Sequence, residues 1–147
     1  MPAQDPKALV RRYFDRVVNQ VDRAAAEELV APDLVFTSPY TPQPVRDRES
    51  FLGMLEAVHA ALPDFNLMDH DLIAEGDRVA SRWTVYGTHQ GQLGPFAPTG
   101  QRLAISGLSI YRIADGKIAE GWVQDDTMQL LAAAAAPGQA PAAASTR

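Results

Sequence analysis

The carboxylate of Asp126 lies at the end of a segment with a strand–turn–strand pattern. Residues 110–131 read IYRIADGKIAEGWVQDDTMQLL, and the Asp-Gly turn within residues 114–117 predicts a hairpin between two apolar strands. Side chains alternate across a strand, so Asp126 is expected to share one face with Ile118, Glu120, Trp122 and Gln124. If that face lines a cavity, Asp126 is the best-placed acid or base in the chain.

A structural role for the same carboxylate is the alternative. Asp126 lies just before a predicted helix, Thr127–Ala135, and aspartate is a common N-cap at such a junction. Asp125 could cap the helix instead, which would leave Asp126 free to point into a pocket.

Two further residues of one strand could take part in chemistry. Arg82 lies in the middle of VASRWTVYG, on the face with Thr84 and Tyr86, where a charge needs either water or a partner. It is therefore a solvent-facing arginine, or one inside a cavity that pairs with a carboxylate or a substrate oxygen. His89 ends the same strand beside a glycine-containing loop, as a general acid or base or as a surface turn residue.

Other sites are excluded by residue type and spacing. The run Asp69-His70-Asp71 predicts no metal site, because neighbouring strand residues point to opposite faces. The chain has no cysteine, which excludes thiolate nucleophiles and thiolate metal ligands. It contains no nucleophile elbow of the G-x-S-x-G type, no phosphate-binding glycine loop and no dinucleotide-binding fingerprint.

The composition is that of one soluble domain. The chain has 147 residues, of which 46% are hydrophobic and 21% charged, with a net charge of −5. This acidic balance gives no electrostatic reason to bind nucleic acid or an anionic membrane. No signal peptide or membrane span is recognisable, and we expect a cytoplasmic protein. We expect an N-terminal extension of residues 1–5, a single domain of residues 6–135 and a disordered Ala/Pro-rich tail of residues 136–147.

The elements that position these residues follow from periodicity. Helical spacing predicts an amphipathic helix that starts at Asp5-Pro6, a second piece capped by Asp22, and another helix over residues 48–62. Strands are expected at residues 34–37, 65–74, 79–89, 102–113 and 118–124, and a proline-rich loop at residues 38–44. Helices followed by hairpins predict an α+β domain in which the helices cover one face of a curved antiparallel sheet.

The succession of motifs resembles the SnoaL-like polyketide cyclases, in the nuclear-transport-factor-2-like superfamily. The matching pieces run in order through most of residues 6–131: Leu62–Phe65, Glu75–Ala80 leading to Arg82-Trp83, Gly87–Gly91, Ala97–Gly100, Arg112 through Gly116–Ile118 to Glu120 and Trp122, and Asp126 with Leu130-Leu131.

The resemblance implies a cone-shaped fold with a deep apolar pocket between sheet and helices, and a homodimer. It implies that Asp126 acts as acid/base in an aldol-type ring closure, or a related proton transfer of the intramolecular lyase or isomerase kind, on a hydrophobic carbonyl compound. No metal or organic cofactor is expected. Arg82 and His89 are candidates for holding substrate oxygens, and the other expected substrate-binding residues are Phe36, Tyr40, Phe51, Trp83, Tyr86, Trp122 and Gln124.

Two positions differ from the family pattern. Many members have histidine where this chain has Gly121, and His-Asp where it has Thr37-Ser38-Pro39. Two other functions are therefore kept: a non-catalytic dimer that binds a small apolar ligand, and an epoxide hydrolase. The epoxide hydrolase ranks last, because that reaction needs two carboxylates bridged by arginine and the strand of Arg82 offers Thr84 instead.

Overall fold

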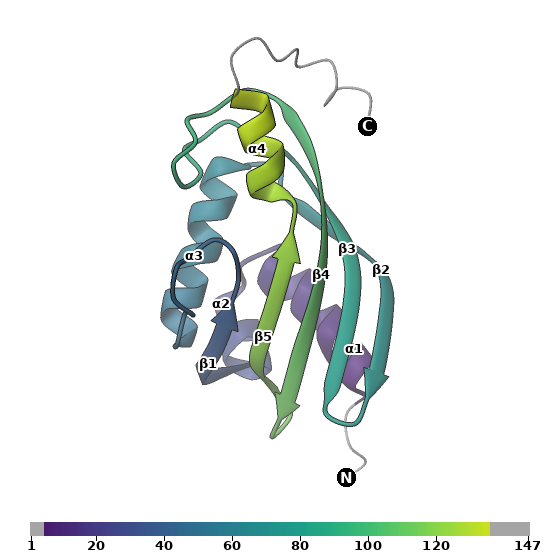
Figure 1. The fold of residues 1–147 in the computed structure, drawn as a ribbon. Coiled ribbons are helices and arrows are strands. Elements are labelled where there is room, and N and C mark those ends of the chain that lie inside the picture. The colour runs from purple at the N-terminus through teal and green to yellow at the C-terminus, as the bar shows by residue number, and fades with distance from the viewer. Residues whose placement is uncertain (1–4, 136–147) are drawn as a thin grey trace.

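The computed structural model describes residues 5–135, in which helices pack on one face of a single sheet (Figure 1). The predictions for residues 1–4 and 136–147 lie outside the described residues. The elements in chain order are α1 (Pro6–Arg12), η1 (Tyr13–Val18), α2 (Arg23–Leu29), β1 (Val30–Thr37), α3 (Arg48–Ala61), β2 (Asn66–Glu75), β3 (Arg78–Thr88), β4 (Arg102–Ala114), β5 (Lys117–Asp125) and α4 (Thr127–Ala135).

The N-terminal helix begins where the sequence predicts. The Asp5 carboxylate accepts a hydrogen bond from Lys7 N at 3.0 Å, and Pro6 occupies the first turn. The helix widens into the π-helical segment η1, which periodicity did not predict, and Asp22 caps α2 through Ala25 N at 3.1 Å. The apolar stripe is nevertheless continuous, because Val10, Phe14 and Val17 are buried along it.

The sheet has the strand order β1-β5-β4-β3-β2. The three hairpin pairs are antiparallel, as expected, whereas β1 runs parallel to β5. The first strand is longer than predicted. It was expected to begin at residue 34, but β1 begins at Val30 and has an irregular register before Val35. Pro32 lies in that irregular stretch, where its missing N–H breaks no regular ladder.

One prediction about strand faces was wrong in part. Strict alternation placed Ile118 on the face of Trp122, but Ile118 is buried with Gly121 and Val123. The reason is a register shift between Arg112 and the next residue of β4, which leaves Ala119 without a partner in that ladder. The extra residue reverses the alternation at the start of β5.

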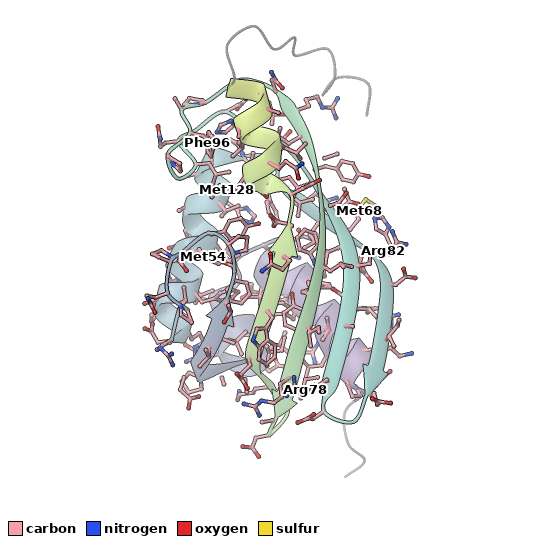
Figure 2. The ribbon with its side chains drawn as sticks, in the orientation of Figure 1. Met54, Met68, Arg78, Arg82, Phe96 and Met128 are labelled. Carbon is pink, nitrogen blue, oxygen red and sulfur yellow. The ribbon has the colours of Figure 1, made fainter. Side chains whose placement is uncertain are left out.

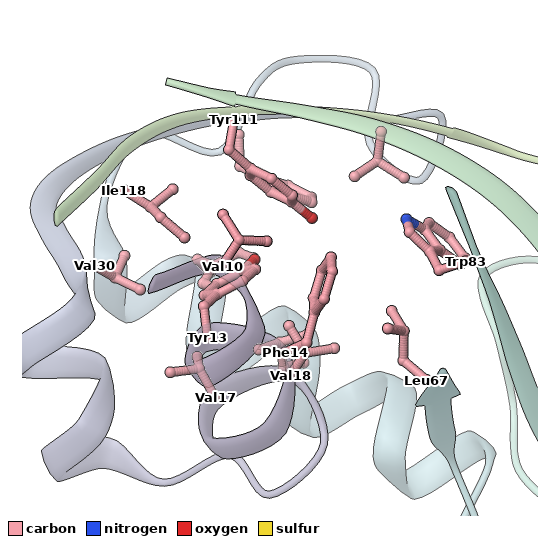
Figure 3. Close-up of a cluster of buried hydrophobic side chains, with 14 of the residues drawn as sticks. Val10, Tyr13, Phe14, Val17, Val18, Val30, Leu67, Trp83, Tyr111 and Ile118 are labelled. Carbon is pink, nitrogen blue, oxygen red and sulfur yellow. The ribbon is translucent and has the colours of Figure 1, made fainter. Parts of the chain in front are cut away.

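The core lies between the inner face of the sheet and the helices. Figure 3 shows Phe14 between Tyr111 of β4 and Trp83 of β3, with Leu67 of β2 beside it. The outer face is different, because the large hydrophobic side chains that are exposed among residues 5–135 lie on it: Met68, Ile73, Tyr86, Leu108 and Ile110. Met68 lies on the opposite side of the molecule from Met54 of α3 (Figure 2). The α+β prediction is thus confirmed.

Candidate functional site

An apolar cavity of about 70 Å³ lies between the sheet and the helices. Its walls come from both layers and include Phe14, Phe36, Phe51, Trp83 and Tyr111. Such a cavity favours an uncharged, hydrophobic ligand.

A second compartment of about 30 Å³ lies next to it, toward α4. It is lined by Leu62, Leu93, Ile105 and Thr127 in addition to four residues that both compartments share. The shared residues are Tyr40, Val58, Phe65 and Val85. These four side chains therefore form the partition between the compartments.

A polar cluster adjoins the partition and consists of Tyr40, which belongs to the partition, with Asp125 and Thr127. The Tyr40 hydroxyl donates a hydrogen bond to Asp125 Oδ2, and it lies 3.4 Å from Thr127 Oγ1. Asp125 Oδ1 accepts a hydrogen bond from Thr127 N at 3.0 Å. The carboxylate of Asp125 is thus one hydrogen bond away from a side chain that lines both compartments.

Burial governs the protonation of the Tyr40 hydroxyl. Burial raises the pKa of Tyr40 far above its usual range, and the negative charge of Asp125 raises this pKa further. Tyr40 is therefore a hydrogen-bond donor at neutral pH, and Asp125 Oδ2 is its acceptor.

The other polar groups on the inner face satisfy one another. Trp83 Nε1 donates to Ser109 Oγ at 2.9 Å, and the hydroxyl of Ser81 lies 2.8 Å from the same oxygen. All three residues are buried. This network fixes the indole of Trp83 in the cavity wall.

Four of the predicted substrate-binding residues line the cavity: Phe36, Tyr40, Phe51 and Trp83. Gly121 packs against two of the rings in this wall, because a Cβ on it would lie 3.0 Å from Phe36 and 3.2 Å from Tyr111. The aromatic rings thus fill the space that a histidine would need at this position.

The remaining predicted wall residues lie on the outer face of the sheet. Tyr86 is 43% exposed, and Trp122 lies under the guanidinium of Arg78, 5.3 Å from the ring centroid. Gln124 is exposed on the same face. The side-chain alternation of β3 and β5 aims these residues away from the cavity, so they do not line it.

Arg82 also lies on the outer face. Its Nε donates to Asp71 Oδ2 at 2.7 Å, and both side chains are more than half exposed. The solvent-facing interpretation of Arg82 is the one that the structure supports, because β3 directs even-numbered residues outward around this position. Figure 2 labels Arg82 next to Met68, on the side away from α3.

Asp126 lies in an open groove on that outer face. Its Oδ1 accepts a hydrogen bond from Ser106 N at 3.0 Å, and its carbonyl accepts the N–H of Leu130 at 2.9 Å, as at a helix start. The groove is about 450 Å³ and is also bordered by Arg82, Gln124 and Asp125. Asp126 and the apolar cavity therefore lie on opposite faces of the sheet, and its acid/base role stays a prediction.

His89 is fully buried at the base of the loop formed by residues 90–101. Its Nδ1 accepts a hydrogen bond from Thr99 N at 3.3 Å, and its backbone pairs with Gln101 O and Gly100 N at 2.8 Å each. Burial lowers the pKa of His89. The side chain closes the loop, and it is absent from the walls of both compartments.

From the sequence, Asp125 is expected only as a helix cap, and Thr127 only as the first residue of a helix. The Oδ1 atom of Asp125 does contact the first turn of α4, but its Oδ2 atom faces Tyr40. The alternation along β5 that directs Trp122 to the outer face directs Asp125 toward the inner face, so the sequence pattern already separated the two residues. What was missing was the knowledge of which face of β5 is buried.

The described part of the chain shows neither a cluster of metal ligands nor a membrane-spanning helix. Residues 5–135 contain no group of three or more His, Asp or Glu side chains arranged to hold a metal ion. Among the same residues, no helix is both long and apolar enough to span a bilayer.

Comparison with known proteins identifies the family. Residues 8–134 match the family described as SnoaL-like polyketide cyclase. A search of curated proteins found no match.

Solved structures are similar over most of the chain. IdmH from Streptomyces antibioticus, a candidate polyketide cyclase, is 31% identical with a TM-score of 0.77, over 88% of this chain and 97% of IdmH. AclR from Streptomyces galilaeus, a candidate hydroxylase, is 32% identical with a TM-score of 0.72, over 88% of this chain and 94% of AclR. A SnoaL-like protein from Jannaschia shares the fold at 21% identity, with a TM-score of 0.81 over 92% of this chain and 99% of that protein. This chain therefore belongs to the SnoaL-like polyketide cyclase family.

Proposed function

We propose that the protein is a cofactor-independent enzyme that catalyses an aldol-type cyclisation, or a related proton transfer, on a hydrophobic polyketide-type carbonyl compound. An aspartate at the end of β5 is its acid/base. The observation that carries this proposal is the hydrogen bond from Tyr40, which lines an apolar cavity, to the carboxylate of Asp125. The family and the likeness to IdmH support the substrate class.

The chemistry suits a single carboxylate. The carboxylate removes a proton from a carbon flanked by two carbonyls, and the resulting enolate is delocalised. Its carbon then attacks a ketone of the same chain and forms the ring bond. The carboxylic acid returns its proton to the new alkoxide, so the enzyme ends in its starting state. The Tyr40 hydroxyl, which stays protonated, can donate to a carbonyl oxygen on which negative charge develops.

Asp125 is the better placed of the two neighbouring carboxylates. Both carboxylates border the outer groove, but Asp125 is also hydrogen-bonded to Tyr40 in the cavity wall, whereas Asp126 accepts a hydrogen bond from Ser106 N. An apolar substrate loses more water-exposed surface in the cavity than in an open groove. We therefore assign the acid/base role to Asp125 and keep Asp126 as the competing assignment.

Paired amide variants test this assignment. Asp125→Asn and Asp126→Asn preserve shape and remove one carboxylate each. The proteins are incubated with a panel of linear and monocyclic β-polyketide esters in D₂O, and ring closure and deuterium uptake at the acidic carbon are followed by mass spectrometry and NMR. We expect Asp125→Asn to lower the rate by about 10²- to 10⁴-fold, and Asp126→Asn to retain most of it.

The other outcomes have definite meanings. A loss confined to Asp126→Asn moves the reaction to the outer groove. Full activity in both variants rejects carboxylate catalysis at this strand end. If the wild-type protein binds panel members without exchange or turnover, the second candidate holds, which is a non-catalytic module for small apolar ligands. The almost wholly apolar wall of the larger compartment favours that candidate.

We also propose that the protein is a homodimer that pairs through the outer face of its sheet. This face carries large exposed apolar side chains, among them Leu108 at 60% and Ile110 at 44% exposure. Its charges are paired locally, as in Arg82–Asp71 and in the 2.6 Å contact of Arg112 and Glu120. Two copies of this face therefore repel each other less than the net charge of −5 suggests.

Light scattering after size-exclusion chromatography tests the dimer. The double variant Leu108→Glu with Ile110→Glu should elute as a monomer, because it buries like charges in the interface. Ala57→Glu, at an exposed position of α3 on the other side of the sheet, is the matched control and should remain dimeric. A wild-type protein that is monomeric at micromolar concentration contradicts the proposal.

A further inference from the structure

The cavity is too small, in the arrangement observed, for the ligands that its walls favour. Its compartments measure about 70 Å³ and about 30 Å³. An apolar cavity of about 150 Å³ is known to hold one benzene molecule. Even together the two compartments fall short of that volume, so a compound with a single ring enters only when a wall side chain is displaced and the compartments join.

Among the residues of the partition, Tyr40 is the one best able to move. Val58 belongs to α3 and Val85 to β3, so the backbone of each is held by regular hydrogen bonds. Phe65 lies between α3 and β2, but its N–H donates to Leu62 O at 2.9 Å and its ring packs 4.6 Å from the ring of His59. Tyr40 lies in the loop between β1 and α3, which Figure 1 shows as an arch beside α3. The Tyr40 backbone N–H bonds only to the nearby Ser38 Oγ, at 3.2 Å.

The hydroxyl of Tyr40 is held much more firmly than its backbone. It donates to Asp125 and lies close to Thr127 Oγ1, and these residues belong to the end of β5 and the start of α4. A hydrogen bond to a carboxylate is worth more than one between neutral groups. The ring of Tyr40 is thus fixed in the partition by its tip.

We propose that Tyr40 is a gate, which separates the compartments while its hydroxyl is bonded to Asp125 and joins them when that bond breaks. Displacement of Tyr40 also exposes the carboxylate of Asp125 to the cavity, so that ligand entry and access to the acid/base from the cavity are one event. This coupling to the acid/base rests on the function proposed above. The gate itself rests on the cavity walls and the hydrogen bond.

The gate implies a chemical requirement for the ligand. When Tyr40 leaves, Asp125 keeps the N–H of Thr127 but loses the hydroxyl, and a half-buried carboxylate that loses a hydrogen-bond donor on its cavity side is less favourable. A ligand that brings its own O–H to the carboxylate replaces the lost bond. We expect the favoured class to be ring compounds with an enol or phenol hydroxyl at one end, over the same compounds without it.

Two probes that differ in one methyl group test both parts of the proposal. 2-Naphthol has the hydroxyl, whereas 2-methoxynaphthalene has the same rings and no donor. Their binding is followed by the fluorescence of the naphthalene ring, with association rates from stopped flow and dissociation constants from titration. The wild-type protein should prefer 2-naphthol by about tenfold.

Three variants complete the experiment. Tyr40→Phe keeps the ring and removes the bond to Asp125, so it should bind 2-methoxynaphthalene about tenfold faster or more tightly than wild type. Asp125→Asn should lose the preference for 2-naphthol. Tyr86→Phe, a tyrosine on the outer face, is the matched control and should behave as wild type. Circular dichroism confirms that each variant is folded.

The gate is rejected if Tyr40→Phe and wild type bind both probes at equal rates and affinities, and equally if neither protein binds them. The two proposals fail separately. An inactive Asp125→Asn variant with no effect in Tyr40→Phe removes the gate and keeps the enzyme. An active Asp125→Asn variant that has lost the preference for 2-naphthol keeps the gate and removes the acid/base assignment.

Discussion

The hydroxyl of Tyr40 donates a hydrogen bond to the carboxylate of Asp125, although 85 residues separate them in the chain. This bond ties the loop after β1 to the junction of β5 and α4. It is also the point at which polar groups meet the apolar cavity. Stability and ligand access therefore depend on the same contact.

Loss of this hydroxyl should lower stability. Tyr40→Phe deprives Asp125 of one of its two hydrogen-bond donors, and we expect the free energy of unfolding to fall by about 1–3 kcal/mol. Urea unfolding followed by circular dichroism measures this change. Tyr86→Phe removes an outer-face hydroxyl and should change it by less than about 0.5 kcal/mol. Equal values for the two variants would show that the buried bond contributes nothing.

Two glycine-to-alanine substitutions should change the free energy of unfolding in opposite directions. A Cβ on Gly107 would overlap ring atoms of Trp83, so Gly107→Ala should lower the free energy of unfolding by about 1–3 kcal/mol or more. Gly53 lies at an exposed position of α3 with nothing within 4 Å of its added Cβ. Gly53→Ala should therefore raise the free energy of unfolding by about 0.5–1 kcal/mol. Thermal unfolding distinguishes the two, and a stabilised Gly107→Ala would mean that Trp83 does not cover Gly107.

Removal of the hydroxyl that accepts the Trp83 indole should also be costly. Ser109→Ala leaves Trp83 Nε1 buried without its acceptor and Ser81 without its partner, and we expect a loss of about 1–3 kcal/mol. Ser106→Ala, on the outer face of the same strand, is the control and should change stability by less than about 0.5 kcal/mol. Urea unfolding compares them, and a neutral Ser109→Ala would contradict the network.

Stability should depend on pH through His89. Burial lowers the pKa of His89 in the folded protein, whereas the unfolded chain binds the same proton with a pKa of 6.5. The folded state is thus fully favoured above pH 6.5 and loses stability as the pH falls below it, by at most about 1.4 kcal/mol per pH unit.

A carboxylate sets a separate window at lower pH. Hydrogen bonds from the N–H and hydroxyl of Thr88 lower the pKa of Asp64, so its contribution is lost only as the pH falls below its unfolded value of 3.8. Urea unfolding between pH 7 and 5 therefore isolates His89. His89→Asn should flatten this dependence, whereas His70→Asn, at an exposed position, should keep it. An unchanged slope in His89→Asn would assign it to another group.

Local pattern was sufficient for most of the fold. Asp5-Pro6 and Asp22 mark helix starts by the chemistry of capping, and the Asp-Gly turn at 115–116 joins β4 to β5 as predicted, with positive φ at both residues. Alternation along β3 correctly grouped Arg82 with Thr84 and Tyr86. These features depend on neighbouring residues alone, which is why the sequence contains them.

Tertiary structure decided which face of each strand is buried, and with it the site. Alternation sorts Asp125 and Asp126 onto opposite faces but does not say which face the helices cover, so the sequence analysis favoured the outer carboxylate. The register shift at Ala119 and the parallel contact of β1 with β5 depend on pairing between distant segments. The bond from Tyr40 to Asp125 likewise exists only after β1 has docked beside β5. Residue types and periodicity determined the elements, whereas the packing of the sheet against the helices decided which acid is hydrogen-bonded to the cavity wall.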